Sequence, residues 1–261
     1  MSAGTDLDAT AAELRRAGCV AAEEEAAELV AVAGGDSARL RRLVGRRCEG
    51  EPLAWLTSSV CFCGETVLVH PGVYVPRWQS EPLAREALAR LPEHGSAVDL
   101  CTGAGAIAVV LARRRPSARV AATEIDPLAV ACARANGVEV FQVEVLQADM
   151  AACLPEALNG RVDVVTAVVP YVPTGELRLL PRDVLAYEPV RALDGGEDGA
   201  RHLIRAAVEA ASLLRPGGSL LLELGGDQAD LLRPVLAENG YSGVELLADE
   251  DHDVRALLCR H

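Results

Sequence analysis

The feature that most constrains the fold is a regular alternation of short apolar segments with longer amphipathic ones after residue 80. The apolar segments, expected as strands, are residues 97–100, 119–124, 139–147, 162–167 and 219–224, followed late in the chain by 243–248 and 254–260. The amphipathic segments, expected as helices, are residues 81–90, 105–115, 127–136, 199–214 and 228–239. Strands that alternate with such helices predict an α/β domain whose parallel sheet is covered on both faces. Ligands of such sheets bind at the carboxyl ends of the strands.

The chain before residue 81 has a different pattern. Residues 7–48 repeat Leu and Val at helical spacing among Ala, Glu and Arg, with breaks at Gly18 and residues 34–35, which predicts a small helical bundle. Residues 61–75 are rich in Val, Phe and Tyr around turn residues, which predicts two short strands joined by turns. We therefore expect a helical domain over 1–58, a β-hairpin connector over 59–76 and a catalytic domain over 77–261.

The charge and composition exclude several classes of function. A formal net charge of −13 argues against a nucleic-acid partner, because such binding rests on a basic surface. All 25 basic residues are Arg, which excludes lysine Schiff-base chemistry and a phosphate-binding loop with its lysine. The eight cysteines form no Cys-x-x-Cys pair, so neither a metal site nor a disulfide framework is expected.

The location of the protein is predicted from two absences in the sequence. No apolar run reaches the ~20 residues that span a bilayer, so no membrane partner is expected. The first residues also lack the basic start and apolar run of a signal peptide. We therefore expect a cytoplasmic protein. The sequence does not indicate an oligomeric state, and its five scattered histidines are interpreted as surface or structural residues.

A candidate cofactor site lies at the ends of the first three expected strands. Asp99 ends the first strand, and Gly103 and Gly105 follow in a turn that opens a helix, where the backbone can approach a ligand closely. A carboxylate at this position repels a pyrophosphate but attracts an amino-acid ammonium. Glu124 ends the second strand, placed to accept ribose hydroxyls, and Asp149 follows the third, placed to accept an adenine amino group.

Three acids at successive strand ends match a cationic amino-acid nucleoside. The sequence therefore predicts S-adenosylmethionine as cofactor, with S-adenosylhomocysteine as its product, and a methyltransferase activity. The other expected cofactor contacts come from the same loops and are Cys101, Thr102, Ile107, Ile125 and Met150. The competing interpretation is that the glycine-rich turn is an ordinary loop and Asp99 a helix cap, but it does not account for the ordered set of acids.

Several stretches resemble the HemK-type protein glutamine methyltransferases, which methylate the side-chain amide of a glutamine in peptide chain release factors. The matching stretches are residues 51–57, 71–77, 99–107, 170–173, 187–199 and 222–225 with Gln228. The resemblance implies a class I methyltransferase fold, with a Rossmann-like seven-stranded sheet behind a small helical substrate-recognition domain. It covers the chain from about residue 51 to the carboxyl end.

The chain departs from this family where the chemistry takes place. The family has Asn-Pro-Pro-Tyr after the fourth strand, and here the acceptor-site positions are Val168, Val169, Pro170 and Tyr171. In the family the Asn side chain accepts a hydrogen bond from the amide to be methylated, which Val168 cannot do. A second departure is Arg77-Trp78 with Glu81, where the family has Arg-Pro-Asp-Thr-Glu. The resemblance places Arg77, Trp78, Glu81 and Glu188 on the substrate side.

Three hypotheses about function follow. The first is an active methyltransferase with a changed acceptor, an amine or hydroxyl of a small molecule or peptide, since methyl transfer needs mainly correct positioning. The second is the parental glutamine methylation of release factors. The third is a protein that binds the cofactor without catalysis.

Overall fold

The computed structural model describes residues 3–137, 143–249 and 252–261. At the N-terminus it has four helices, α1 Ala3–Arg16, α2 Ala22–Ala33, α3 Ser37–Cys48 and α4 Leu53–Thr57. These helices enclose a core of their own, in which Leu14 and Leu29 are fully buried. The helical prediction for residues 7–48 is confirmed, and its breaks fall at Gly18 and Gly34, both with positive φ.

A two-stranded hairpin links the helical unit to the rest of the chain. Strands β1 Ser59–Phe62 and β2 Glu65–Leu68 pair antiparallel, and Phe62 and Val67 are buried in the core of the following domain. The prediction placed these strands within residues 61–75, but the second one ends at Leu68. The chain from Val69 onward packs Val73 and Val75 into the core without strand pairing, because the Pro71-Gly72 turn interrupts the extended run.

The main sheet has seven strands in the order β10-β11-β9-β6-β3-β4-β5. The strands are β3 Ser96–Leu100, β4 Arg119–Glu124, β5 Val143–Gln147, β6 Val162–Ala167, β9 Leu214–Glu223, β10 Ser242–Ala248 and β11 Val254–Arg260. Six of them run in the same direction, and β11 runs antiparallel to both of its neighbours. The central strands are buried on both faces, as their nearly continuous apolar sequences require.

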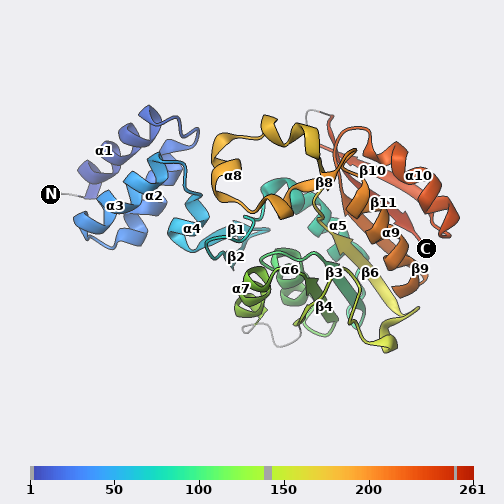
Figure 1. Cartoon of the computed structure of the whole chain (residues 1–261). Coiled ribbons are helices and arrows are strands. Elements are labelled where there is room, and N and C mark those ends of the chain that lie inside the picture. The colour runs from blue at the N-terminus through green and yellow to red at the C-terminus, as the bar shows by residue number, and fades with distance from the viewer. Residues whose placement is uncertain (1–2, 138–142, 250–251) are drawn as a thin grey trace.

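Helices cover both faces of this sheet (Figure 1). On one face lie α5 Glu81–Arg90, α6 Ala106–Arg114 and α7 Pro127–Gly137, and on the other α9 Arg201–Leu213 and α10 Gln228–Glu238. The predicted seven-stranded α/β fold is therefore confirmed. Of the strand predicted over 139–147, residues 139–142 lie outside the described part of the chain, and the rest is β5. Leu214, expected to end a helix, instead begins β9, whose start pairs with Val162 of β6.

A long insertion between β6 and α9 lies over the carboxyl edge of the sheet. It contains β7 Val172–Pro173, α8 Arg182–Tyr187 and β8 Asp194–Gly196, with the 3₁₀ turns Thr174–Leu179 and Val190–Ala192. Two further 3₁₀ turns are Trp78–Ser80 and Glu156–Leu158. Figure 1 shows α8 between the helical unit and the sheet, and the Tyr187 ring packs edge-on against Trp55. The carboxyl edge is thus enclosed by the insertion. None of the helices in the described part of the chain is long and apolar enough to cross a lipid bilayer.

Candidate active site

A cavity of about 1060 Å³ lies at the carboxyl edge of the sheet. The residues after β3, β4, β5, β6 and β9 contribute to its wall, together with the insertion and the segment before α5. This is the position at which parallel α/β sheets bind their ligands. A second cavity of about 50 Å³ lies beside it, next to the turn after β3. Size and position make the larger cavity the candidate active site.

The turn after β3 is shaped by Asp99 and two glycines. Asp99 is buried, and its two carboxylate oxygens accept hydrogen bonds from the hydroxyls of Thr102 at 2.5 Å and Thr166 at 2.6 Å. Burial raises the pKa of Asp99 to about 6, against the effect of both hydroxyls. The carboxyl borders the smaller cavity and lies behind the turn.

Glycine is required at these two positions for different structural reasons. Gly103 has a φ of +58° at the tip of the turn, and its backbone N–H faces the cavity wall formed by Glu124. Gly105 has a φ of +86°, and a Cβ there would meet Ala133 of α7 at 3.2 Å. Gly105 therefore lets α6 start close against α7, whereas Gly103 bends the backbone toward the ligand space.

Glu124 holds the ends of two loops together. One carboxylate oxygen accepts the N–H of Gly103 at 2.9 Å, and the other accepts those of Ile125 and Asp126 at 2.8 and 2.9 Å. These bonds use about three of the four acceptor positions of a carboxylate. Glu124 and Ile125 both line the cavity, so the remaining acceptor capacity faces the ligand space.

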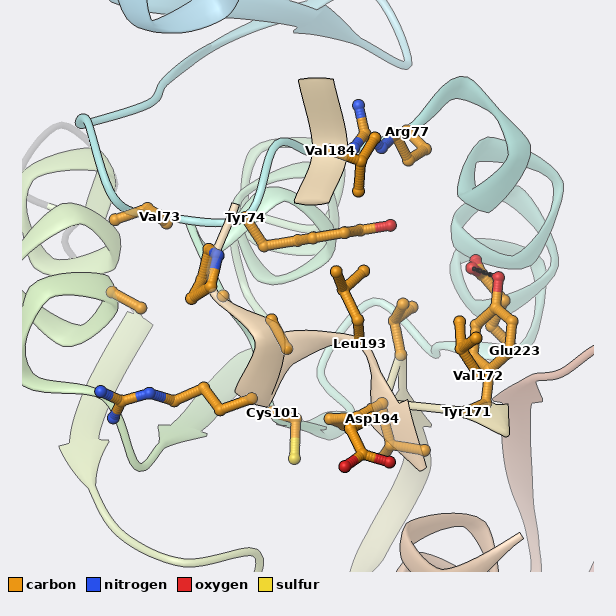
Figure 2. Close-up of a pocket in the computed structure, with 18 of the residues that line it drawn as sticks. Val73, Tyr74, Arg77, Cys101, Tyr171, Val172, Val184, Leu193, Asp194 and Glu223 are labelled. Carbon is orange, nitrogen blue, oxygen red and sulfur yellow. Dashed lines mark hydrogen bonds between the residues drawn. The ribbon is translucent and has the colours of Figure 1, made fainter. Parts of the chain in front are cut away.

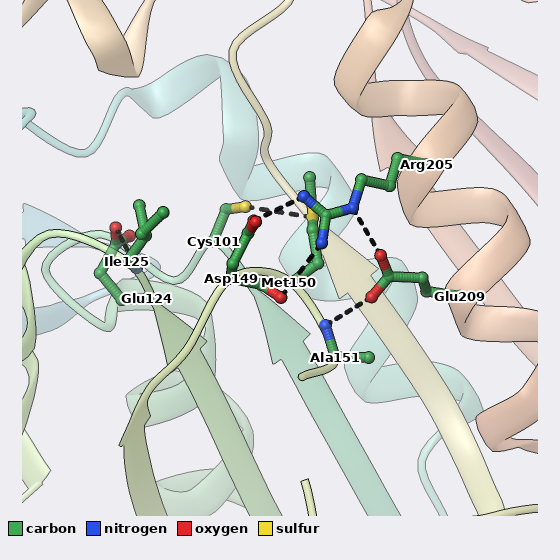
Figure 3. A network of polar contacts seen from close by, with 8 residues as sticks. All are labelled: Cys101, Glu124, Ile125, Asp149, Met150, Ala151, Arg205 and Glu209. Atoms are coloured by element: carbon green, nitrogen blue, oxygen red, sulfur yellow. Dashed lines mark hydrogen bonds and ion pairs between the residues drawn. The ribbon is translucent and has the colours of Figure 1, made fainter. Parts of the chain in front are cut away.

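Asp149, after β5, is held by a cation that the sequence did not suggest. Arg205 of α9 donates to its carboxylate at 2.7 Å, and the same guanidinium bonds Glu209 at 2.6 Å (Figure 3). Glu209 in turn accepts the N–H of Ala151 at 2.8 Å, which fastens the loop after β5 to α9. Only the spacing of Arg205 and Glu209, four residues apart on an expected helix, signalled a pair, and nothing in the sequence linked it to Asp149.

The remaining cofactor candidates also gather around the turn after β3. Cys101, Gly103 and Met150 line the large cavity, and the Cys101 and Met150 sulfurs are 3.5 Å apart. Thr102 and Ile107 border the small cavity. Gly105 borders neither cavity and acts only through the backbone. The structure thus brings the three acids and their loops to one place.

The positions expected on the acceptor side lie after β6, next to the end of β9. Val168, Val169, Pro170 and Tyr171 all line the cavity, as expected, and the two valines give it an apolar wall. The Tyr171 hydroxyl donates to Glu223 at 3.1 Å (Figure 2). Burial raises the pKa of Tyr171, so the phenol keeps its proton.

Glu223 is a cavity residue that the sequence analysis did not nominate. It ends β9 with 3% of its surface exposed, and burial raises its pKa against the effects of the Ser80 and Tyr171 hydroxyls and of Arg255. In the sequence it appeared only within a stretch that resembles the family's fifth strand. A Glu at the end of an apolar strand was the available signal.

The four substrate-side candidates divide into two pairs. Arg77 and Trp78 line the cavity, and Arg77 stacks on the Tyr74 ring, 5.1 Å from its centroid. Glu188 is buried, pairs with Arg77 and accepts the Val75 N–H at 3.2 Å.

Neither Glu81 nor Glu188 borders the cavity. Glu81 instead holds α5 against the hairpin. It pairs with Arg85 and accepts the Cys63 N–H at 2.9 Å, which ties α5 to the hairpin. Glu81 and Glu188 therefore fasten the connector, and their place in the structure is behind the wall that Arg77 and Trp78 present. The family resemblance placed all four residues near the acceptor, but it did not distinguish those that line the cavity from those that hold the lining in place.

Comparison with known proteins places this geometry in a family. The family model described as "Methyltransferase small domain" matches residues 66–171. A release factor glutamine methyltransferase of Neisseria gonorrhoeae is 40% identical over 81% of this chain and 77% of its own length. The chain belongs to the HemK-type methyltransferase family.

Two further similarities bear on the fold and the acceptor. A 4-amino-L-phenylalanine/4-methylamino-L-phenylalanine methyltransferase of Streptomyces pristinaespiralis is 37% identical to this HemK-type chain over 87% of it and 79% of the relative. A 16S rRNA methyltransferase of T. thermophilus, solved in complex with AdoMet and guanosine, has a TM-score of 0.55 and 21% identity. It covers 77% of this chain and 49% of its own, and shows the fold alone.

This HemK-type methyltransferase uses S-adenosylmethionine as its cofactor. The residues fit the molecule, because Glu124 and Asp149 line the large cavity and Asp99 borders the small cavity next to it, beside a glycine turn that leaves open space at Gly103. No cluster of three His, Cys, Asp or Glu side chains within residues 3–137, 143–249 and 252–261 is arranged to hold a metal ion.

Two other cavity residues escaped the sequence analysis. Tyr74 extends across the pocket toward the side of Tyr171 and Glu223 (Figure 2). His202 of α9 also lines the cavity, and burial lowers its pKa, helped by Arg201 and Arg205. For this histidine, the interpretation as a surface or purely structural residue is incomplete. Its partners are distant in sequence, so no local pattern revealed it.

Proposed function

We propose that this HemK-type methyltransferase transfers a methyl group to an uncharged amine of a small molecule or peptide. The observation that carries the proposal is the apolar pair Val168 and Val169 at the end of β6, on the wall of the cavity. In the family, an Asn at the first of these positions accepts a hydrogen bond from the substrate amide. A site without that group cannot orient an amide in this way.

The chemistry of the acceptor explains why an amine suits this site. When bound, S-adenosylmethionine supplies a methyl group on a positively charged sulfur, ready for in-line displacement. The lone pair of an amide nitrogen is delocalised into its carbonyl, so an amide must be held closely to react. The lone pair of an uncharged amine is available, and holding it at the right distance and angle supplies most of the catalysis.

We assign the cofactor side as follows. The Asp99 carboxyl attracts the ammonium group through the turn, Glu124 accepts hydroxyls of the ribose, and Asp149 accepts the adenine amino group. Their support comes from position, since Glu124 and Asp149 line the large cavity and Asp99 borders the small one. Ile125 and Met150 contribute apolar contact beside them.

A relative supports the change of acceptor. The name of the Streptomyces pristinaespiralis relative gives it an aromatic amine as substrate, at an identity close to that of several release factor methyltransferases. Amine acceptors therefore occur on closely similar chains. The division into a helical unit over 1–58, a connector over 59–76 and a catalytic domain over 77–261 fits a protein in which the helical unit closes the acceptor side.

The test is a transfer assay with labelled S-adenosylmethionine and a panel of aromatic amines, alkylamines, phenols and a peptide carrying a Gly-Gly-Gln loop. We expect label on an amine and little on the glutamine. Calorimetry with the cofactor alone runs beside it. Tight cofactor binding without transfer to any acceptor, in the panel or in a cell extract, contradicts the proposal and leaves the non-catalytic hypothesis.

Glutamine methylation of release factors is the second candidate. The observation in its favour is that most of the similar curated relatives carry that name. It predicts one added methyl group on the glutamine of the Gly-Gly-Gln loop, detected by mass spectrometry. Absence of that methyl from a preparation shown to bind the cofactor excludes it.

A further inference from the structure

The carboxylate of Glu223 is only half engaged. Its Oε1 accepts the Tyr171 hydroxyl at 3.1 Å, while Oε2 is shielded from solvent and accepts no hydrogen bond of normal geometry from the residues that the structure describes, although the nearby Ser80 hydroxyl lowers the pKa of the carboxyl. A buried carboxylate oxygen without a partner costs free energy and calls for an explanation. Because Glu223 lines the cavity, a small rotation of its carboxylate that exposes Oε2 to the cavity lets a ligand supply the missing donor.

Glu223 lies next to the position at which the family's asparagine is missing. Ala167 of β6 pairs in register with Leu222 of β9, so Val168 and Glu223 are the next residues along the two parallel strands. Val168 packs on the same core cluster as Leu221, two residues before Glu223. Side chains alternate along a strand, so those of Val168 and Glu223 face the same side of the sheet.

We propose that Glu223 binds the acceptor, its free Oε2 accepting a hydrogen bond from the N–H of an aromatic amine while Tyr171 holds the carboxylate in place. This inference rests on the proposed amine methylation and names its substrate class. A carboxylate only accepts hydrogen bonds, so it matches a nitrogen that carries hydrogens. Glu223 thus takes over, from the neighbouring strand, the orienting contact that Val168 cannot make.

The charge and shape of the pocket favour an aromatic amine over an alkylamine. An alkylamine is protonated at neutral pH, as Lys is with its pKa of about 10.4, and has no free lone pair. An aromatic amine stays uncharged because the ring draws on its lone pair. Tyr74, Val169, Val184 and Leu193 line the same cavity, and these apolar and aromatic side chains suit the faces of a flat ring.

The proposed step balances in atoms and charge. The amine lone pair forms the new nitrogen–carbon bond as the carbon–sulfur bond breaks, with its electron pair staying on sulfur. The nitrogen is then positively charged and still carries hydrogen. It passes a proton to Oε2 of Glu223, which leaves a neutral N-methylamine and S-adenosylhomocysteine, and the carboxyl later loses the proton to solvent.

The surroundings of Glu223 suit this role. Burial raises its pKa, which makes the carboxylate a better acceptor for the proton that the methylated nitrogen gives up. The Tyr171 and Ser80 hydroxyls and the charge of Arg255 act in the opposite direction. Arg255 is itself paired with Asp249 at 2.6 Å, so its charge is largely balanced on the other side.

The test replaces the carboxylate by its amide, Glu223→Gln, which keeps the shape and lets Tyr171 still donate to Oε1. With an aromatic amine that the unaltered enzyme methylates, such as 4-amino-L-phenylalanine, we expect kcat/KM to fall at least 100-fold. The Kd for S-adenosylmethionine, measured by calorimetry, should stay within twofold. The part of the loss of rate at acidic pH that comes from protonation of Glu223 should disappear in the variant, and only the part that comes from protonation of the aromatic amine itself should remain.

Two variants separate binding from mere support of Tyr171. Tyr171→Phe keeps the carboxylate, and Glu245→Gln alters an exposed carboxylate on β10 as a matched control with unchanged activity. If Glu223 only positions Tyr171, Glu223→Gln has no further effect in the Tyr171→Phe background. We expect a further loss of at least tenfold. Binding of the aromatic amine, titrated in the presence of S-adenosylhomocysteine, should weaken in Glu223→Gln and not in Glu245→Gln.

Different experimental results would contradict the proposed amine methylation and the proposed role of Glu223. Transfer to an aromatic amine that Glu223→Gln retains within threefold overturns the role of Glu223 and leaves amine methylation standing. Transfer to an alkylamine or a phenol but to no aromatic amine overturns the substrate class. Transfer only to the glutamine of the Gly-Gly-Gln peptide overturns both proposals together.

Discussion

The cofactor side and the acceptor side of the same cavity are built in opposite ways. At the ends of β3, β4 and β5 every nominated acid is already held, Asp99 by two hydroxyls, Glu124 by three backbone N–H groups and Asp149 by Arg205. At the ends of β6 and β9 the wall is apolar, and the carboxylate of Glu223 has an oxygen without a partner. On the cofactor side, polar groups that are already held in place suit a ligand common to the family. On the acceptor side, where polar groups are few, one substitution is enough to change the acceptor.

The largest expected effect tests the cofactor side. Glu124→Ala removes the hydrogen bond to Gly103 and the group we assign to the ribose. Hydrogen bonds to a charged group contribute about 1.5–3 kcal/mol each, so we expect cofactor binding at least ~100-fold weaker by calorimetry. Glu144→Gln, an exposed carboxylate on neighbouring β5, is the matched control and should bind as the unaltered protein does. Binding within threefold in Glu124→Ala contradicts the assignment.

The next effect sharpens the acceptor half. Val168→Asn returns the amide side chain that the family has at this position, next to the Tyr171 segment. One restored hydrogen bond of about 1–3 kcal/mol should raise methylation of a Gly-Gly-Gln peptide about tenfold or more, measured by mass spectrometry. Val168→Leu keeps the wall apolar and serves as control. Equal glutamine transfer by both variants means that this position does not decide the acceptor.

Asp99 gives a pH-dependent prediction on the cofactor half. Its pKa is raised from 3.8 to about 6, so between these values the folded chain holds more protons than the unfolded chain. The free energy of unfolding therefore falls as the pH rises through this window. Above pH 6 the ionised, buried carboxyl costs the folded state about 2–3 kcal/mol.

Asp99→Asn removes that cost and also the charge to which we assign the attraction of the cofactor ammonium. We expect the ligand-free variant to be about 1–3 kcal/mol more stable than the unaltered protein in urea unfolding at pH 8, with little difference near pH 4. Cofactor binding should weaken about tenfold, as for the loss of one charged contact. A variant that is less stable at pH 8 would show that the hydroxyl contacts of Thr102 and Thr166 outweigh the burial of charge.

The smallest effect concerns Arg205. Its ion pair with Asp149 is partly exposed, with 40% and 52% of the side chains accessible, and such pairs contribute at most about 1 kcal/mol. Arg205→Ala should therefore raise the KM for S-adenosylmethionine only about two- to fivefold, with kcat unchanged. Arg233→Ala, which breaks an exposed pair with Asp230 on α10, is the control. A loss of tenfold or more would assign Arg205 a direct part in cofactor binding.

Much of the fold could be predicted because the periodicity of apolar residues is a local property. The expected strands at 119–124, 162–167 and 254–260 and the helix at 81–90 match β4, β6, β11 and α5. The start of β9 was wrong because Leu214 joins the sheet through pairing with distant Val162, which local pattern does not contain. The helix ends differ from the expected ones by one or two residues.

The same distinction, between local sequence pattern and contacts of distant residues, applies to the candidate site. Asp99, Glu124 and Asp149 could be nominated, and their gathering at one edge predicted, because each lies at the end of an apolar strand and parallel strands end at one edge of a sheet. Glu81 and Glu188 could be assigned to their supporting roles only after the hairpin and the insertion were in place.

The sequence by itself determined the α/β alternation, the three carboxylates at strand ends and the missing asparagine, since each is a matter of residue type and spacing along the chain. Only the tertiary structure decided that Arg205 reaches Asp149 across 56 residues and that Glu223 stands beside Val168 with one oxygen free. The physical reason is that burial and hydrogen-bond satisfaction depend on which strands become neighbours, and neighbours in a sheet are set by the packing of the whole domain.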